Sequence, residues 1–263
     1  MVPAMRDLER TSNHKCNYPW TFFNHAEFSQ EFRERTQAET KAECRYEVIS
    51  KDHWAIPSWT NNDLMAESAK LLEEKKVHYS RLKSYHQMCR WNSERFHDHP
   101  ALKDIRRYWR VEPKVEYLLL RCGLRRVQVH GPQQQTYGFV IKICDPPESI
   151  ETLWPHTLEF LAENPDYLHP KYAMAWLTDS KNRPDHQKSR YWTCHFRSNF
   201  EIADMNLWRS KKYRDYFDHL DRPGGFFYER WGDAPVRSIA LGLIEDKNRI
   251  HWFRDIVTNT YHT

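Results

Sequence analysis

The chain has 263 residues and a mass of 32.0 kDa, with 13 Phe, 11 Trp and 14 Tyr but only 7 Gly. So few glycines leave no room for a glycine-rich dinucleotide or phosphate-binding loop, and an evenly spread net charge of +4 does not by itself argue for nucleic acid. The longest apolar run, residues 239–244, is far shorter than the roughly 20 residues of a membrane helix. The composition therefore predicts a soluble, aromatic-rich globular protein.

The N-terminus and the cysteines add little about location. Residues 1–8 contain no hydrophobic stretch that resembles a signal peptide. The 6 cysteines form no CxxC pair, which argues against a structural zinc ribbon and leaves the redox compartment open. No repeat or linker divides the chain, so we expect one continuous domain over residues 1–263.

The first half of the chain predicts a buried strand at residues 18–24 and helices at 27–38 and 84–97. Residues 61–63 offer N-cap oxygens to another helix, whose apolar residues are expected on one side: Leu64, Met65, Leu71 and Leu72. Aromatic and β-branched residues predict strands at 108–111 and 137–143.

The second half predicts helices at residues 150–163 and 172–177. Asp204 can cap a helix whose apolar residues recur at i, i+3, i+4 and i+7: Tyr213, Tyr216, Phe217 and Leu220. A turn at 222–225 and an apolar helix at 234–244 follow. Strands that alternate with helices predict an α/β sandwich.

Four stretches hold residue types that carry chemistry. Glycines and aromatic residues at 224–233 fit either a ligand contact or a tight turn beside a buried strand. In an extended segment 195–201, alternate residues share one face, which fits either a site or a solvent-facing edge strand: His195, Arg197, Asn199 and Glu201. Glu112 follows a predicted strand, where metals and phosphates bind in α/β sheets. By contrast, the spacing at 97–99 (HDH) favours solvated residues over metal ligands.

Taken together, these segments resemble the fungal Golgi α-1,2-mannosyltransferases of glycosyltransferase family 15. The resemblance runs from about residue 13 to residue 255. The motifs that carry it are 85–90 (YHQMCR), 108–113 (YWRVEP), 164–167 (NPDY), 194–204 (CHFRSNFEIAD), 224–238 (GGFFYERWGDAPVRS) and 250–256 (IHWFRDI). The fourth and fifth are long and rarely seen elsewhere.

The resemblance implies a GT-A-like fold with a mixed central sheet flanked by helices. It implies transfer of mannose with retention, from GDP-mannose and with Mn²⁺, to a mannosylated glycan or glycoprotein acceptor. Glu112 and His251 would converge on the ion, and Glu201 would face the sugar as the candidate nucleophile. The donor and acceptor contacts would come from five residues: Tyr85, Arg90, His195, Trp231 and Asp233. No nucleic-acid partner is implied.

The chain also departs from the family pattern. The anchor helix, stem and first strand of the family have no counterpart here, so we expect a catalytic domain truncated at both ends. Lys114 stands where an acid is usual, and Arg237 where histidine is usual. Residues 118–135 replace an acidic family strand; the family codons, read in another frame, give the Leu-Arg-Cys-Gly-Leu-Arg-Arg of residues 120–126. We expect a local frameshift there, with a divergent loop as the alternative.

Two other functions compete with the transferase. The lost strand and Lys114 favour an inactive relative that binds sugar or partner proteins, whereas the retained Glu112, His251 and Glu201 favour the enzyme. A single-stranded RNA binder is suggested by the aromatic and basic composition, but the charges do not cluster.

Overall fold

The computed structural model describes residues 1–113, 115–120, 135–178, 190–254 and 256–260, without the side chains of 118–120 and 257–260. Its strands are β1 Trp20–Asn24, β2 Cys44–Val48, β3 Arg107–Val111, β4 Val115–Leu120, β5 Tyr137–Phe139, β6 Lys142–Cys144, β7 Cys194–Phe196, β8 Phe200–Asp204, β9 Ile250–Trp252 and β10 Ile256–Thr260. Its α-helices are α1 Val2–Leu8, α2 His14–Cys16, α3 Gln30–Gln37, α4 Lys51–Trp54, α5 Asn62–Glu74, α6 Lys83–Ser93, α7 Leu153–Glu163, α8 Met205–Trp208, α9 Lys211–Asp221, α10 Gly225–Tyr228 and α11 Asp233–Ile244.

The largest sheet has the strand order β3-β8-β5-β9. Strand β8 runs antiparallel to both of its neighbours, and β5 pairs with β9 in parallel, so the sheet is mixed. Three two-stranded sheets accompany it: β1 with β2, β4 with β10 and β6 with β7. This arrangement confirms the predicted α/β class.

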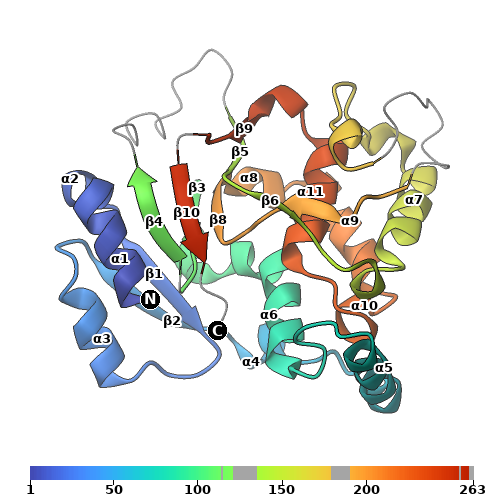
Figure 1. Cartoon of the computed structure of the whole chain (residues 1–263), viewed down its shortest axis with the longest axis horizontal. Coiled ribbons are helices and arrows are strands. Elements are labelled where there is room, and N and C mark those ends of the chain that lie inside the picture. The colour runs from blue at the N-terminus through green and yellow to red at the C-terminus, as the bar shows by residue number, and fades with distance from the viewer. Residues whose placement is uncertain (114, 121–134, 179–189, 255, 261–263) are drawn as a thin grey trace.

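Each face of the central sheet packs on its own apolar cluster. One face contributes Tyr137, Phe139 and Ala203 to the main core, and Figure 1 shows α7, α9 and α11 gathered on one side of the sheet. The other face contributes Phe200, which packs with Val115 and Tyr117 of β4 and with Leu8 of α1. Residues one step apart along a strand therefore serve different cores, as the two-residue period of a strand requires.

The predicted elements of the first half are largely confirmed. Strand β1 and helix α3 lie within the predicted ranges, whereas α6 spans Lys83–Ser93 in place of 84–97. The Asn61 side chain caps α5 by accepting bonds from Asp63 N and Leu64 N. The four apolar residues predicted on one side of α5 differ in burial. Met65 and Leu72 are buried, but Leu64 and Leu71 are 44% and 52% exposed, because α5 buries a narrower stripe than its leucines suggest.

In the second half, α7 and α11 are confirmed, whereas two long segments are divided. The predicted strand at 137–143 forms β5 and β6, and the segment at 195–201 forms β7 and β8 with a turn at Ser198 and Asn199. Asp204 caps only the short α8, while Ser210 caps α9, whose predicted apolar face is fully buried. A short 3-10 helix, Met174–Trp176, replaces the helix predicted at 172–177.

A disulfide bond joins Cys144 at the end of β6 to Cys194 at the start of β7. The two residues are direct partners in the antiparallel register of these strands, so the bond closes one end of the β6–β7 pair. The pairing of the cysteines was left open by the sequence. Most of the segment interpreted as a frameshift, residues 121–134, lies outside the described residues. Among the described residues, no helix has the length and apolar character needed to cross a membrane.

Burial predicts very different costs for the same substitution on α9 and on α5. Leu220 is completely buried, so Leu220→Ala should lower the free energy of unfolding by about 2–5 kcal/mol. Leu71→Ala removes the same atoms from a side chain that is 52% exposed and should change it by at most about 0.5 kcal/mol. Urea unfolding measures both. Similar losses in the two variants would contradict the described packing of α9.

Candidate active site

Glu201 is the most deeply buried acid of the central sheet. It lies on β8, directly opposite Arg110 of β3 and Phe139 of β5, and its exposed fraction is 0%. Its Oε1 accepts hydrogen bonds from the Tyr108 hydroxyl and from Arg237 Nη1, and its Oε2 accepts one from the Tyr137 hydroxyl at 3.2 Å. Both carboxylate oxygens are thus bound by the protein itself, which is how a buried charge is stabilised.

Arg237 of α11 supplies the charge that balances Glu201. Its guanidinium lies over the rings of Phe96 and Trp208, at 4.6 and 4.8 Å from their centroids, and Nη2 donates to the Asn92 carbonyl at 2.5 Å. Burial alone would lower the pKa of Arg237, but the Glu201 carboxylate raises that pKa well above its ordinary value. The arginine therefore stays charged and fixes β8 to α11.

A second ion pair joins the sheet to the first residue of α11. Arg110 of β3 donates Nη1 to Asp233 and Nη2 to Glu112 at 2.6 Å. Asp233 is buried, which would raise its pKa, but Arg110, Arg237 and a bond from Ser198 lower that pKa below its usual value. Asp233 is consequently an ionised group at the start of a helix, where negative charge is favoured.

A third polar group gathers around Asp145, which follows β6. Arg230 Nη2 contacts Asp145 Oδ1 at 2.7 Å and Ser149 Oγ at 3.0 Å, and its guanidinium lies 6.0 Å from the centroid of the Tyr85 ring. The His195 Nδ1 atom is 3.5 Å from Asp145 Oδ2. Burial lowers the pKa of His195, and Asp145 only partly opposes this shift, so the imidazole is a neutral hydrogen-bonding group.

The structure brings some of the residues predicted from the sequence together. Tyr85 and His195 lie around the Arg230–Asp145 pair, and Arg110 links Asp233 to Glu112. The prediction that residues 195–201 form one extended segment with a shared polar face is wrong, because a turn separates β7 from β8. The alternative of a solvent-facing edge strand is wrong as well, because His195, Asn199 and Glu201 are buried.

Trp231 and Arg90, two further residues predicted as donor or acceptor contacts, make contacts within the protein. Trp231 is 0% exposed, packs against Phe226 and donates its indole N–H to Glu229 at 2.8 Å. Trp231 thus packs in the main core, and its contact with a sugar stays a prediction. Arg90 forms a two-pronged ion pair with Asp221, with both contacts at 2.7 Å.

His251 lies on the opposite face of the sheet from Glu201. It pairs with Gly138, which pairs in turn with Ile202, the residue after Glu201. Its ring lies 4.6 Å from that of Phe253, which fills the space where a side chain at Gly138 would stand. Glu112 directly follows β3, and β8 and β5 lie between β3 and the strand β9 that carries His251. The convergence of Glu112 and His251 on one ion stays a prediction.

Four residues of the buried ion pairs described above have no role predicted from the sequence: Arg110, Asp145, Arg230 and Arg237. Arg110 could be found, since it lies on the predicted strand two residues before Glu112, and residues two apart in extended chain share a face. Arg237 stands out only as a departure from the family histidine. Asp145 and Arg230 are 85 residues apart, and nothing local in the sequence indicates that they meet.

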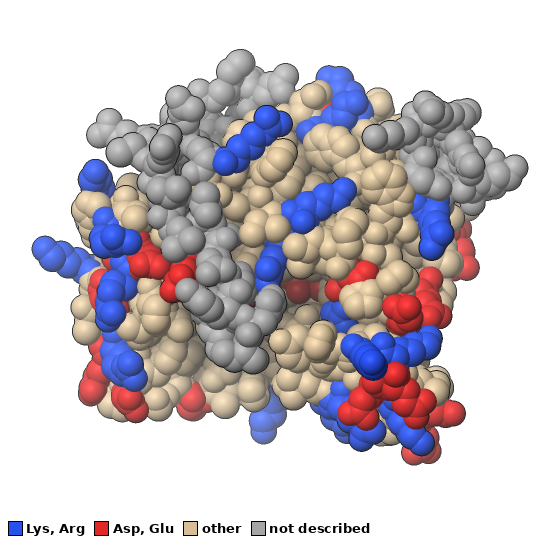
Figure 2. Space-filling view, in the orientation of Figure 1, with Lys and Arg blue, Asp and Glu red and all other residues tan. Residues whose placement is uncertain are grey.

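The face of the molecule in Figure 2 carries basic and acidic side chains close to one another. Several basic side chains lie across its upper half and centre, and both signs occur together at the lower right. No large area of a single charge is visible there, unlike the basic stripe typical of nucleic-acid binders.

This chain is an α/β protein with a mixed sheet, a layer of helices and buried ion pairs between acids and arginines. Comparison with known proteins identifies its family. The family model of glycolipid 2-alpha-mannosyltransferases matches residues 1–263. The chain therefore belongs to this family, which confirms the resemblance found in the sequence.

Similar proteins include one curated relative and two solved structures. The chain is 41% identical to "Glycolipid 2-alpha-mannosyltransferase 2" of Candida albicans, over 97% of this chain and 54% of the relative. Core-mannan synthase A (CmsA/Ktr4) of Aspergillus fumigatus, solved in an Mn/GDP form, is 54% identical with a TM-score of 0.90, covering 98% of this chain and 70% of that one. Ktr4p of Saccharomyces cerevisiae, solved with GDP, is 37% identical with a TM-score of 0.90, covering 100% and 67%.

The fold therefore matches that of solved mannosyltransferases. The chain spans about half to two thirds of the length of the curated relatives it matches.

The buried Glu201–Arg237 pair should be strongly coupled. Arg237→Leu leaves an unpaired buried carboxylate and should lower the free energy of unfolding by about 3–5 kcal/mol. The double variant that also carries Glu201→Gln should regain at least about 1 kcal/mol of this lost free energy of unfolding. The control Arg35→Leu removes an exposed arginine that pairs with Glu31 and should cost at most about 1 kcal/mol. Additive effects of the two buried substitutions in a urea double-mutant cycle would contradict the pairing.

Asp233 should contribute a pH-dependent part of the stability. Because its folded pKa is lowered, its contribution is complete above the unfolded value of about 3.9 and is lost as the pH falls through the folded pKa. The difference in unfolding free energy between the parent and Asp233→Asn should therefore shrink below about pH 4. The exposed Asp63→Asn serves as the control. A difference that grows on acidification would show that the pKa is raised instead.

Proposed function

We propose that this chain carries the catalytic region of an α-1,2-mannosyltransferase that moves mannose from GDP-mannose to a mannosyl acceptor. The observation that carries the proposal is the match to a relative solved in an Mn/GDP form, at 54% identity over 98% of this chain. Alignment with the family over residues 1–263 supports the same conclusion. The acceptor is a mannosylated glycan or glycoprotein.

The fold is of the GT-A type that binds nucleotide sugars. A mixed sheet with helices packed on one face, and charged residues where β3 ends, supports this class. In α/β sheets, ligands bind beyond the carboxyl ends of strands. Glu112 directly follows β3, and Asn199 comes shortly after β7 ends at Phe196. The polar groups near these ends are therefore the candidates for donor binding.

Mn²⁺ fits the donor chemistry of Glu112 and His251, since manganese accepts carboxylate and imidazole ligands. The Glu112 side chain is 37% exposed, and one of its oxygens contacts Arg110; His251 is exposed on β9. The ion would neutralise charge that develops on the departing diphosphate. Arg110, whose Nη2 donates to one Glu112 oxygen, would hold that carboxylate in position.

Retention of configuration requires either a covalent intermediate on a carboxylate or departure and attack on the same face of the sugar. Both Glu201 oxygens accept hydrogen bonds from Tyr108, Arg237 and Tyr137, and this occupancy weakens Glu201 as a nucleophile. We favour the same-face reaction, in which the bond from the anomeric carbon to the diphosphate oxygen breaks. The acceptor oxygen bonds to that carbon and its proton passes to the diphosphate.

Asp233 and His195 are the residues best suited to orient hydroxyl groups. Asp233 is ionised and accepts hydrogen bonds, while His195 is neutral, and hydrogen bonds to a charged acceptor are the stronger kind. Tyr85 beside Arg230 would add an aromatic surface to the same region.

The site of action we propose is the Golgi lumen. The Cys144–Cys194 bond supports an oxidising compartment of the secretory pathway, because structural disulfides are rare in the cytosol.

The second candidate function is a non-catalytic relative that binds sugar or a protein partner. Complete burial of Glu201 against Arg237 favours it, because a carboxylate locked in this way does not face a substrate. Metal-dependent binding of GDP separates the two functions, since only the transferase needs it.

The chain should bind GDP in the presence of Mn²⁺ and lose at least tenfold in affinity when the metal is removed. Glu112→Gln and His251→Gln should each lose about 10-fold or more, as measured by calorimetric titration. The matched controls, Glu148→Gln and His78→Gln, change residues away from the site and should bind as the parent does.

Two results would contradict the proposal. GDP binding that is absent, or equal with and without Mn²⁺, would favour the non-catalytic relative. A parent-like affinity in both Glu112→Gln and His251→Gln would remove these residues from the metal site.

A further inference from the structure

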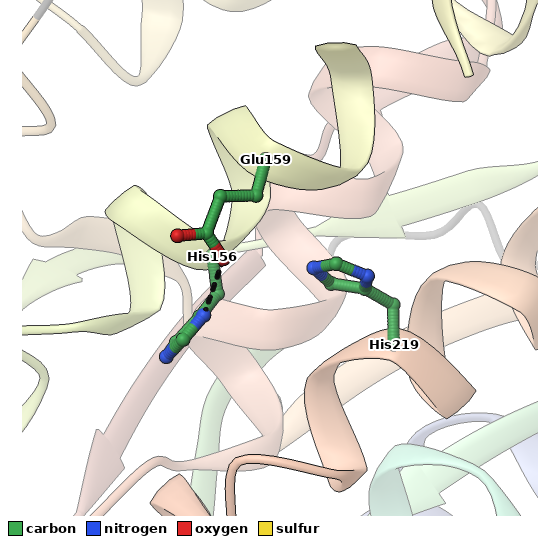
Figure 3. Close-up of side chains that lie close together, drawn as sticks. All are labelled: His156, Glu159 and His219. Carbon is green, nitrogen blue, oxygen red and sulfur yellow. Dashed lines mark hydrogen bonds and ion pairs between the residues drawn. The ribbon is translucent and has the colours of Figure 1, made fainter. Parts of the chain in front are cut away.

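A group of potential metal ligands lies between two helices, apart from the candidate active site. It consists of His156 and Glu159 on α7 and His219 on α9, with ligand atoms that all lie within 4.8 Å of one another. His156 Nδ1 is 2.8 Å from Glu159 Oε2. Figure 3 shows both α7 side chains beside the His219 ring, which reaches toward them from the facing helix.

Helix geometry and packing hold these residues in place. His156 and Glu159 are three residues apart, so they share one side of α7. The two helices are fixed to each other by a hydrogen bond of 2.9 Å between the Thr157 and Tyr216 hydroxyls. The Phe160 ring also packs against that of His219, with centroids 5.5 Å apart. The cluster therefore rests on a rigid base rather than on a loop.

The carboxylates at the cluster are paired with histidines rather than with Lys or Arg in the part of the chain that the structure describes. Glu163, one turn after Glu159, lies 3.9 Å from His219 Nδ1 and adds a second carboxylate. Among the ion pairs of the described residues, neither Glu159 nor Glu163 has a Lys or Arg partner.

A second cluster provides the contrast. It consists of Glu94, His97 and Asp98, and arginines already bind its carboxylates. Arg95 contacts Glu94 at 2.7 Å and Arg214 contacts Asp98 at 2.6 Å. A cation would have to displace these groups, so this second cluster is not suited to a metal.

We propose that His156, Glu159 and His219 form a zinc-type metal site that joins α7 to α9. Two imidazoles and one carboxylate are a common ligand set for Zn²⁺, which leaves a fourth position for water or another ligand. Glu163 is the nearest candidate for that position. A metal ion can bind His156 Nδ1 only when that nitrogen carries no proton, so the ring would bind as the tautomer protonated at Nε2.

This site would act on the scaffold of the candidate active site. The His156 ring lies 6.1 Å from that of Trp231, and Trp231 is two residues before Asp233. An ion that fixes His156 to His219 stiffens the packing beneath the start of α11. The role is structural, and it does not depend on the proposed transferase activity.

The test is Zn²⁺ titration of the metal-free chain, with an excess of Mn²⁺ to occupy other sites. The parent should bind one Zn²⁺, and about 100 times the dissociation constant of Zn²⁺ should raise its Tm by roughly 5 °C. His219→Gln and His156→Gln should each lower the affinity at least 10-fold and remove the Tm shift. His78→Gln, an exposed histidine outside the cluster, should bind Zn²⁺ as the parent does.

Co²⁺ supplies an independent reading, because its visible absorption reports four-coordinate ligation. The parent and His78→Gln should show that absorption, and the two cluster variants should lack it. Zn²⁺ affinity that is equal in all four proteins, or no Zn²⁺ binding by the parent, would overturn the proposal. A loss in His78→Gln as large as in the cluster variants would overturn it as well.

Discussion

The ion pair between Glu201 and Arg237 is the constraint on which the centre of this structure depends. A carboxylate with no exposed surface is tolerated only with a charged partner and hydrogen bonds, and Glu201 has Arg237, Tyr108 and Tyr137. This pair fixes a middle strand, β8, to the most buried helix, α11. The Asp233–Arg110 pair fixes the start of the same helix to β3. Two ion pairs between charged side chains therefore join the central sheet to α11.

The same constraint shapes the chemistry. Glu201 is the residue that the family resemblance implies as a nucleophile, yet here it is the counter-ion of Arg237. Glu112, which is half-buried and directly follows β3, and His251, which is exposed on β9, remain as acid and imidazole groups. A reaction that depends on donor binding and on a departing diphosphate fits this arrangement better than one that needs a free carboxylate.

Periodicity predicted much of the fold. The buried face of α9 and the apolar α11 follow from spacing, because a helix that packs on a core repeats its apolar residues every three to four positions. The exposed Leu64 and Leu71 of α5 could not be predicted, since a pattern shows which residues share a side but not how much of that side is covered. The turn that separates β7 from β8 also carries no glycine or proline to indicate it.

Only the site residues that lie in family motifs, or at alternate positions of a predicted strand, could be predicted from the sequence. Arg237 is 36 residues from Glu201 and Arg110 is 123 from Asp233, so tertiary structure alone makes these pairs. The most direct test is a crystal structure of the chain with GDP and Mn²⁺. We expect the ion bound by Glu112 and His251 beside the diphosphate, with Glu201 still paired to Arg237. An ion held by other residues, or a Glu201 carboxylate turned toward the nucleotide, would contradict this account.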